Sequence, residues 1–272
     1  MKFIPEDDVK VSEVNYNPDA MNEVIASFSS PVEMAALLKD SDVEFSKRYL
    51  LEPDKVKNYS SSYKKALGLG VLSADLGYLN VYNQTSEILD YLVSIRRLTD
   101  DLQLSQFFDF HVLKRLATSD DNVDSLLIMS VQSYQNMDEH LRMSKRSNMS
   151  ALLVTGVWLE SFYLVTQVAK EKPSQQFRET IGEQKNILNN LLPILKLFKD
   201  QDEFFDNLVL NMLELKEVLD VVSIETSVVD KGEKRDDGVI EQNEYSIVTV
   251  SDEELLEIIL TAEKVRNKII NN

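Results

Sequence analysis

Two acidic residues stand alone in apolar segments and are the strongest candidates for chemistry. Asp75 lies in the nearly uncharged stretch 61–82, and Glu160 lies in a second such stretch, 150–169. A carboxylate among apolar residues must be paired, protonated or directed into a cavity, because burial of an unpaired charge is unfavourable. Two such acids that meet could share a proton or a cation. The more ordinary interpretation is that each acid only hydrogen-bonds a neighbouring helix.

Tyrosines and one further acid could complete a ligand-binding site around this pair. Tyrosine hydroxyls can hydrogen-bond carboxylates or line a pocket, and a polar strip within 174–198 could reach Glu160 from another helix. The candidate ligand-binding residues are Asp75, Glu160, Tyr78, Tyr163, Tyr82 and Glu183. The alternatives are tyrosine rings packed in the core, with Tyr63 and Tyr91 among them, and a solvated position for Glu183.

The sequence lacks the residues of common catalytic and metal sites. It has no cysteine, which excludes disulfides and zinc–thiolate sites, and only two histidines, His111 and His140. The Glu-x-x-His motif of di-iron bundles and the Gly-x-Ser-x-Gly motif of hydrolases are absent. The run Gly68-Leu69-Gly70 is no phosphate loop, because Gly-Lys-Ser/Thr does not follow it. We therefore predict no catalytic residue and no cofactor, leave any metal undefined, favour a non-enzymatic protein and expect His111 at the rim of the core.

The charge of the chain restricts its partners. With 46 acidic and 29 basic residues the net charge is −17, which argues against nucleic acid and against an anionic membrane surface. The segment 151–169 is long enough to cross a bilayer, yet Glu160 at its centre would be costly there. We predict a buried core helix instead of a transmembrane segment. The expected partner is an unidentified protein or small molecule.

Helical periodicity dominates the chain, and 7 glycines and 6 prolines in 272 residues suit long helices with short loops. We predict an all-α, multi-helix bundle formed by one helical domain, 21–272, after a flexible N-terminal arm, 1–20. A β-hairpin with a long polar tip is expected at 223–250, before a C-terminal helix at 251–270. Another helix is expected to begin at the capping serine Ser30. The remaining expected helices cover 61–82, 86–102, 105–117, 120–143, 150–169, 174–198 and 201–222, with a kink or break at Pro193.

The two apolar segments align with each other without a gap at an offset of 85 residues. The alignment pairs Asp75 with Glu160, and it also pairs Ala66-Leu67 with Ala151-Leu152 and Tyr78-Leu79 with Tyr163-Leu164. We infer two related helical units, about 60–145 and 146–222, around a pseudo-twofold axis that could bring the two acids together. Chance similarity of apolar helices is the alternative. Gly70 and Gly77, seven residues apart, share a helix face that a neighbouring helix could approach closely.

Three short motifs carry a resemblance to a known family. They are Ala66-Leu67-Gly68-Leu69-Gly70-Val71, Ala74-Asp75-Leu76-Gly77-Tyr78 and Ile181-Gly182-Glu183-Gln184-Lys185. Over roughly residues 25–200 the chain resembles an uncharacterised all-helical family of Bacteroidetes, whose members often look like exported lipoproteins. The resemblance implies a periplasmic or cell-envelope location and no assigned activity. This sequence shows no leader and no lipid-bearing cysteine, and a cytoplasmic location is expected if Met1 is the native start.

Three functional hypotheses follow. The first is a non-enzymatic envelope protein that binds a partner or a small ligand through its helical bundle. The second is a carboxylate-based metal-binding protein or enzyme that uses Asp75 and Glu160 at the interface of the two units. The third is an interaction module whose hairpin adds a strand to a partner.

Overall fold

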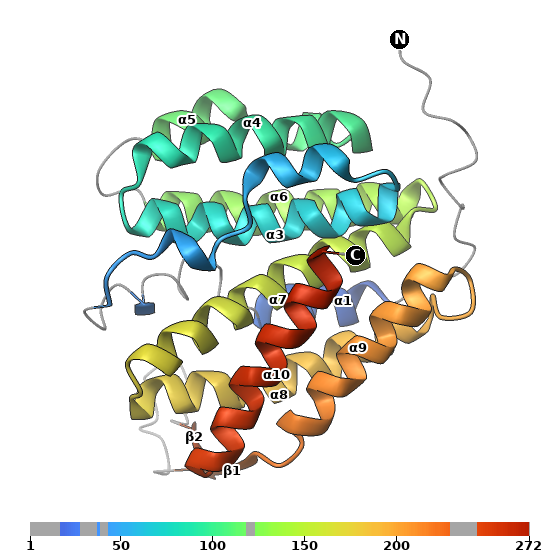
Figure 1. Cartoon of the computed structure of the whole chain (residues 1–272). Helices are drawn as coiled ribbons and strands as arrows, with labels where there is room; N and C mark the ends of the chain where they lie inside the picture. The colour runs from blue at the N-terminus through green and yellow to red at the C-terminus, as the bar shows by residue number, and fades with distance from the viewer. Residues whose placement is uncertain (1–16, 28–36, 39–42, 118–122, 229–243, 272) are drawn as a thin grey trace, which may run out of the picture.

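The chain folds into the expected all-α bundle with one β-hairpin (Figure 1). The computed structural model describes residues 17–27, 37–38, 43–117, 123–228 and 244–271. The α-helices of this part are α1 (Pro18–Ser27), α3 (Ser62–Val81), α4 (Thr85–Leu102), α5 (Phe110–Ala117), α6 (Val123–Met143), α7 (Ser147–Glu171), α8 (Gln175–Lys196), α9 (Glu203–Leu219) and α10 (Asp252–Asn271). Short 3₁₀ turns are η2 (Lys47–Tyr49), η3 (Pro53–Asn58) and η4 (Ser105–Phe107).

Helix α7 is the centre of the molecule. It passes diagonally between a group formed by α3 to α6 and a group formed by α8 to α10 (Figure 1). All of its residues from Ser147 to Ala169 are buried. In the described part of the chain, α7 is the one helix long and apolar enough to cross a membrane, and its most apolar window is entirely covered by the rest of the protein. A helix that is apolar on all sides is typical of such a core position.

Side-chain caps fix the starts of several helices where the sequence predicts them. Ser61 Oγ accepts a hydrogen bond from Lys64 N at 3.2 Å before α3. Before α10, Ser251 and Glu254 form a reciprocal capping box, with Ser251 N donating to Glu254 Oε2 at 2.8 Å and Glu254 N donating to Ser251 Oγ at 3.2 Å. The capping box expected at Ser30 lies outside the described residues.

The first described helix corrects the expected extent of the N-terminal arm. The arm was expected to run to Ala20, but α1 begins at Pro18. Asn17 Oδ1 accepts from the backbone N–H of Asp19 at 3.1 Å, and a proline at the first helical position is preorganised for the helix. Met21, one turn further on, is fully buried. The segment that forms α1 is therefore a short amphipathic helix, although its polar composition did not indicate one.

Two further expectations also need correction. His111 is exposed rather than at the rim of the core, because its neighbour Phe110 takes the inward-facing position of α5. The break expected at Pro193 does not occur, and α8 continues to Lys196. Since Pro193 lies in the last turn of the helix, its missing N–H removes only one hydrogen bond close to the end.

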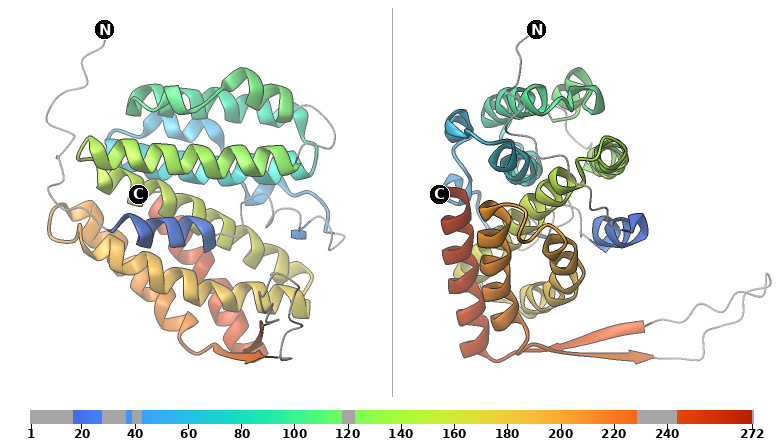
Figure 2. Two further views of the ribbon diagram at one scale, coloured as in Figure 1. Left: turned by 180° about the vertical axis from the view of Figure 1, so that it is seen from behind. Right: turned by 90° about the vertical axis from the view of Figure 1, so that its right-hand side faces the viewer.

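The hairpin has the expected position and leaves the body of the protein. Strands β1 (Ser223–Val228) and β2 (Glu244–Thr249) pair antiparallel, with Ser223 opposite Thr249. The strands extend away from the helices near the start of α10 (Figure 2). Most of the predicted polar tip, 229–243, lies outside the described residues. Addition of a partner strand to this hairpin stays a prediction.

Helices α3 and α7 cross in backbone contact at two glycines. A Cβ added at Gly70 would lie 2.1 Å from the carbonyl oxygen of Leu153, and a Cβ added at Gly156 would lie 2.1 Å from the carbonyl oxygen of Leu67. The contact is reciprocal: Leu67 and Leu153, like Gly70 and Gly156, are 86 residues apart. This local symmetry differs by one residue from the offset of 85 in the sequence alignment. The internal duplication itself stays a prediction.

We expect Gly70→Ala and Gly156→Ala each to lower the free energy of unfolding by about 3 kcal/mol, because the new methyl group meets backbone atoms that cannot move independently. Gly68→Ala is the matched control in α3, since its Cβ meets only the ring of the half-buried Tyr59, which can turn away. Urea unfolding followed by circular dichroism measures the difference. Equal losses for the three variants would contradict a special role for the crossing.

Candidate functional site

The crossing of α3 and α7 brings the two isolated acids together. Asp75 follows Gly70 by five residues and Glu160 follows Gly156 by four, so both acids lie just beyond the same point of contact. The relative exposure of both residues is 0%. The charge of Glu160 acts directly on the carboxyl group of Asp75 and raises its pKa. The structure therefore joins the two acids that the sequence singles out.

An arginine that the sequence analysis missed neutralises this pair. From α10, Arg266 Nε donates to Glu160 Oε2 at 2.9 Å, and Nη2 donates to Glu160 Oε1. The guanidinium group lies 4.5 Å from the centre of the Tyr163 ring and is only 7% exposed. Burial lowers the pKa of Arg266, but the facing charge and hydrogen bonds of Glu160 raise it further, so the arginine keeps its proton.

The surroundings of Asp75 favour its protonated form. Its Oδ2 accepts from Leu51 N at 3.0 Å, whereas Oδ1 receives no hydrogen bond. Burial raises the pKa of Asp75 well above its usual value, and the charge of Glu160 and the hydrogen bond to it act in the same direction. The charge of Arg266 and the Leu51 N–H oppose this shift without overcoming it. A protonated Asp75 can donate to Glu160, and the core then holds one anion and one cation.

The tyrosines of the candidate site have structural partners. Tyr78 Oη accepts from Ser46 N at 3.0 Å, and Tyr82 Oη donates to the carbonyl oxygen of Val43 at 2.9 Å. Both hydroxyls thus fasten the segment before η2 onto α3. Only Tyr163, beneath Arg266, contacts the charged group itself.

The polar strip of α8 reaches α7 at a different residue. Glu183 is exposed on α8, whereas its neighbour Gln184 is buried. Trp158 Nε1 donates to Gln184 Oε1 at 3.1 Å. The polar strip of α8 therefore contacts α7 through Gln184 and the indole of Trp158. Among the described residues, Glu183 forms no hydrogen bond with Glu160.

This cluster is suited to holding helices together. Within the described residues, no group of three or more histidine, aspartate or glutamate side chains could hold a metal ion. The cation beside Glu160 is the guanidinium of Arg266, which a metal ion would have to replace. Since Asp75 and Glu160 have no exposed surface, a substrate could reach them only after the helices separate.

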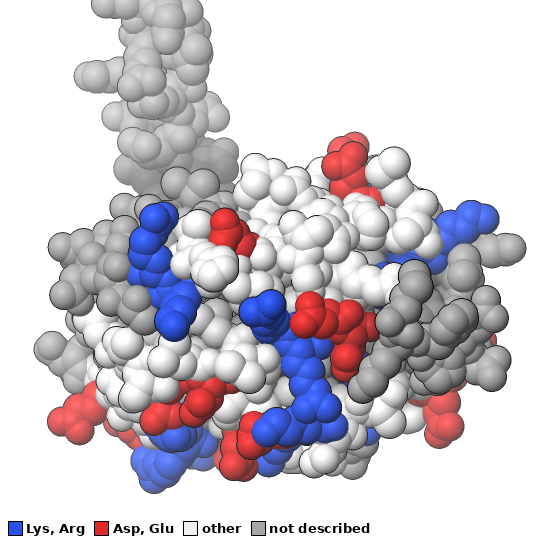
Figure 3. All heavy atoms as spheres, turned by 90° about the horizontal axis from the view of Figure 1, so that it is seen from above, with Lys and Arg blue, Asp and Glu red and all other residues white. Residues whose placement is uncertain are grey.

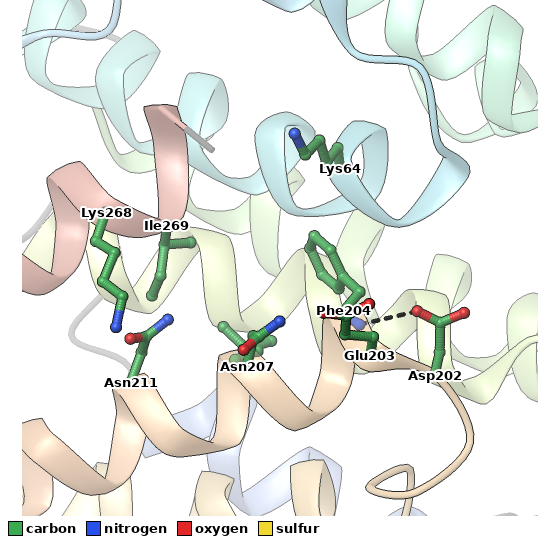
Figure 4. Close-up of a pocket in the computed structure, with 9 residues that line it drawn as sticks. Lys64, Asp202, Glu203, Phe204, Asn207, Asn211, Lys268 and Ile269 are labelled. Atoms are coloured by element: carbon green, nitrogen blue, oxygen red, sulfur yellow. Dashed lines mark hydrogen bonds between the residues drawn. The ribbon is translucent and has the colours of Figure 1, made fainter.

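A second candidate site is an open groove along α9 (Figure 4). It lies between α9, the first turn of α3 and the last turn of α10, and its volume is about 510 Å³. The lining combines two lysines, two acids, two amides and an apolar surface: Lys64, Lys268, Asp202, Glu203, Asn207, Asn211, Phe204, Leu208 and Ile269. None of these residues was among the predicted site residues.

Asn211 is the unusual member of this lining. It is 5% exposed, and its Oδ1 has no hydrogen-bond partner. No carboxylate in the described part of the chain forms an ion pair with the exposed Lys268 at the same end of the groove. The sequence does contain a signal for Asn211, because it occupies an apolar position of α9 between Leu208 and Leu215.

The outer surface seen in Figure 3 carries charges of both signs. Basic and acidic side chains lie beside each other on this face, with uncharged side chains between them. Surface ion pairs such as Lys47–Glu87 and the half-buried Lys65–Asp101 are found on the described part of the chain, and surface pairs of this kind contribute little to stability. The view shows no field of a single sign.

No family model matches the chain, and no match is found among curated proteins or solved structures. The family resemblance of residues 66–78 and 181–185 stays a prediction.

We expect the stability of Asp75→Asn, measured relative to that of the original chain, to increase as the pH rises. The unfolded carboxyl ionises near pH 3.9, whereas folded Asp75 stays protonated to a higher pH. Between these two pKa values the folded state binds more protons than the unfolded state. The free energy of unfolding of the original chain therefore falls by up to about 1.4 kcal/mol per pH unit, whereas that of the asparagine variant does not fall for this reason. Urea unfolding between pH 4.5 and 8 tests the difference.

Asp138→Asn is the control for this pH series. Asp138 is a buried carboxylate that accepts from Arg142 Nε at 2.9 Å and from Ser150 Oγ at 2.7 Å, so its replacement should lower stability. A constant loss of stability in Asp75→Asn at every pH would show that folded Asp75 is ionised.

We expect Arg266→Met to lower the free energy of unfolding by about 3–5 kcal/mol, because Glu160 is then left as a buried charge without its partner. Combining it with Glu160→Gln should restore much of the loss. Lys170→Met, which breaks the exposed Lys170–Glu263 pair, should cost less than about 1 kcal/mol. Similar losses for the two methionine variants, measured by urea unfolding at pH 7, would contradict the central role of Arg266.

Proposed function

We propose that the protein is a non-enzymatic binding protein that holds a small polar ligand in the groove between α3, α9 and α10. The observation that carries the proposal is the unpartnered Oδ1 of the buried Asn211. A buried polar atom without a hydrogen bond is unfavourable by about 1–3 kcal/mol, and such atoms are rare in folded proteins. A hydrogen-bond donor on a bound ligand would remove this penalty.

The other lining groups support a polar ligand. Lys268 offers a cation, Glu203 an anion and Asn207 a second amide, while Phe204 and Ile269 provide apolar contact. The volume of about 510 Å³ is typical of small-molecule sites. The lining contains no histidine, serine or cysteine, so its chemistry favours recognition over catalysis.

The finer parts of the proposal rest on the sequence. A cell-envelope location is supported by the family resemblance, and an internal duplication by the aligned apolar segments together with the reciprocal contact of Gly70 and Gly156. Use of Asp75 and Glu160 as a metal or catalytic site is the weaker alternative, because Arg266 already occupies the position of the cation.

We expect Asn211→Leu to abolish ligand binding while leaving folding stability unchanged or higher by about 1 kcal/mol, since it removes an unsatisfied buried oxygen. A panel of amino acids, dicarboxylates, polyols, sugar phosphates and short peptides would be screened by saturation-transfer NMR. Each compound that binds would then be titrated into the original chain and the variant, with urea unfolding as the stability measurement.

Asn190→Leu, at an exposed position of α8, is the matched control and should bind as the original chain does. The proposal fails if no compound of the panel binds, or if every compound that binds does so equally well to Asn211→Leu.

A further inference from the structure

We infer that the groove binds the main chain of a short peptide in an extended conformation. The inference rests on the proposed function and names its ligand class. It comes from the spacing of the two amides on α9, the charges at the two ends of the groove and its length.

The two asparagines match the repeat of an extended chain. Asn207 and Asn211 are four residues apart on α9 and both line the groove (Figure 4). Four residues of α-helix rise by about 6 Å, and two residues of an extended chain span about 6.6–6.8 Å. A carboxamide carries an acceptor and donors, as a peptide unit does. The amides can therefore bond alternate peptide units, and a peptide N–H supplies the donor that Asn211 Oδ1 lacks.

The acids of the lining lie at one end of the groove, where Lys64 of α3 faces them, and Lys268 lies at the other end (Figure 4). Asp202 already caps α9 by accepting from Phe204 N at 2.9 Å. A peptide placed with its carboxylate at Lys268 and its amino group toward Glu203 has each terminus beside a side chain of opposite charge.

The length of the groove selects the size of the peptide. Glu203 and Asn211 are eight residues apart, about 12 Å along the helix, which corresponds to three or four extended residues. A single amino acid is too short to reach both amides and both ends. Phe204 from α9 and Ile269 from α10 offer apolar contact (Figure 4), so small or apolar peptide side chains fit best.

The test uses tetra-alanine with free termini, titrated into the isotope-labelled full chain and followed by NMR. We expect binding with shifts confined to α9 and the neighbouring turns of α3 and α10. Asn207→Leu and Asn211→Leu should each weaken binding at least about tenfold, since each removes a hydrogen-bonding amide. Lys268→Met, or acetylation and amidation of the peptide ends, should also weaken it. Asn190→Leu is the control.

Tetra-alanine methylated on its internal amide nitrogens keeps the size and the charges but lacks the N–H donors. Equal binding of the methylated and unmethylated peptides, or binding that ignores both asparagine substitutions, overturns the inference. If tetra-alanine does not bind but another compound binds in a manner that depends on Asn211, the peptide inference fails and the proposed function stands. If no compound binds the original chain, both fail.

Discussion

The ion pair between Arg266 and Glu160 is the interaction on which the arrangement of the helices depends. It joins α10 to the central helix α7, and the buried Asp75 beside Glu160 extends the cluster to α3. Arg266 Nη2 also donates to the carbonyl oxygen of Tyr49 at 3.4 Å, which ties in the segment before η3. Segments distant in sequence are thus held at one point. A buried pair of this kind adds little net stability compared with apolar packing, but it selects one helix face and one register.

The groove follows from the same constraint. Lys268 and Ile269 come two and three residues after Arg266, so the guanidinium that fixes α10 in the core also fixes the end of the groove that they form. On the other side, the ring of Tyr63 in α3 lies 5.3 Å from that of Phe205 in α9. The lining therefore stands on helices that are themselves packed, which suits a site with a defined geometry.

The fold was largely predictable from the sequence because helical periodicity and capping are local. Ser61 and Ser251, for example, cap the helices that their sequence context predicts. Asp75 and Glu160 were recognisable as unusual because a lone acid in an apolar segment stands out. Their partner was not, although Arg266 occupies an apolar position of α10, seven residues after Ile259.

The groove could not be predicted from the sequence for a different reason. Phase along a helix shows that Arg266 or Asn211 points inward, but it does not show which of the other helices it meets. Asn207 and Lys268 belong to separate helices, and only the packing of α9 beside α10 brings them to one surface. Helix α1 was not predicted because its few apolar residues lie within a polar segment. They become recognisable as core residues only from their packing against the rest of the core.

The position of Arg266 along the chain also sets an order in time. It is 106 residues beyond Glu160, and a ribosome adding about 5–20 residues per second needs about 5–20 s to cover that distance. Throughout this interval α7 exists with its central carboxylate but without the guanidinium that makes its burial favourable. Burial of Glu160 as a charged group becomes favourable only once α10 has emerged. The last step of core formation therefore waits for the synthesis of the helix that carries the counter-charge.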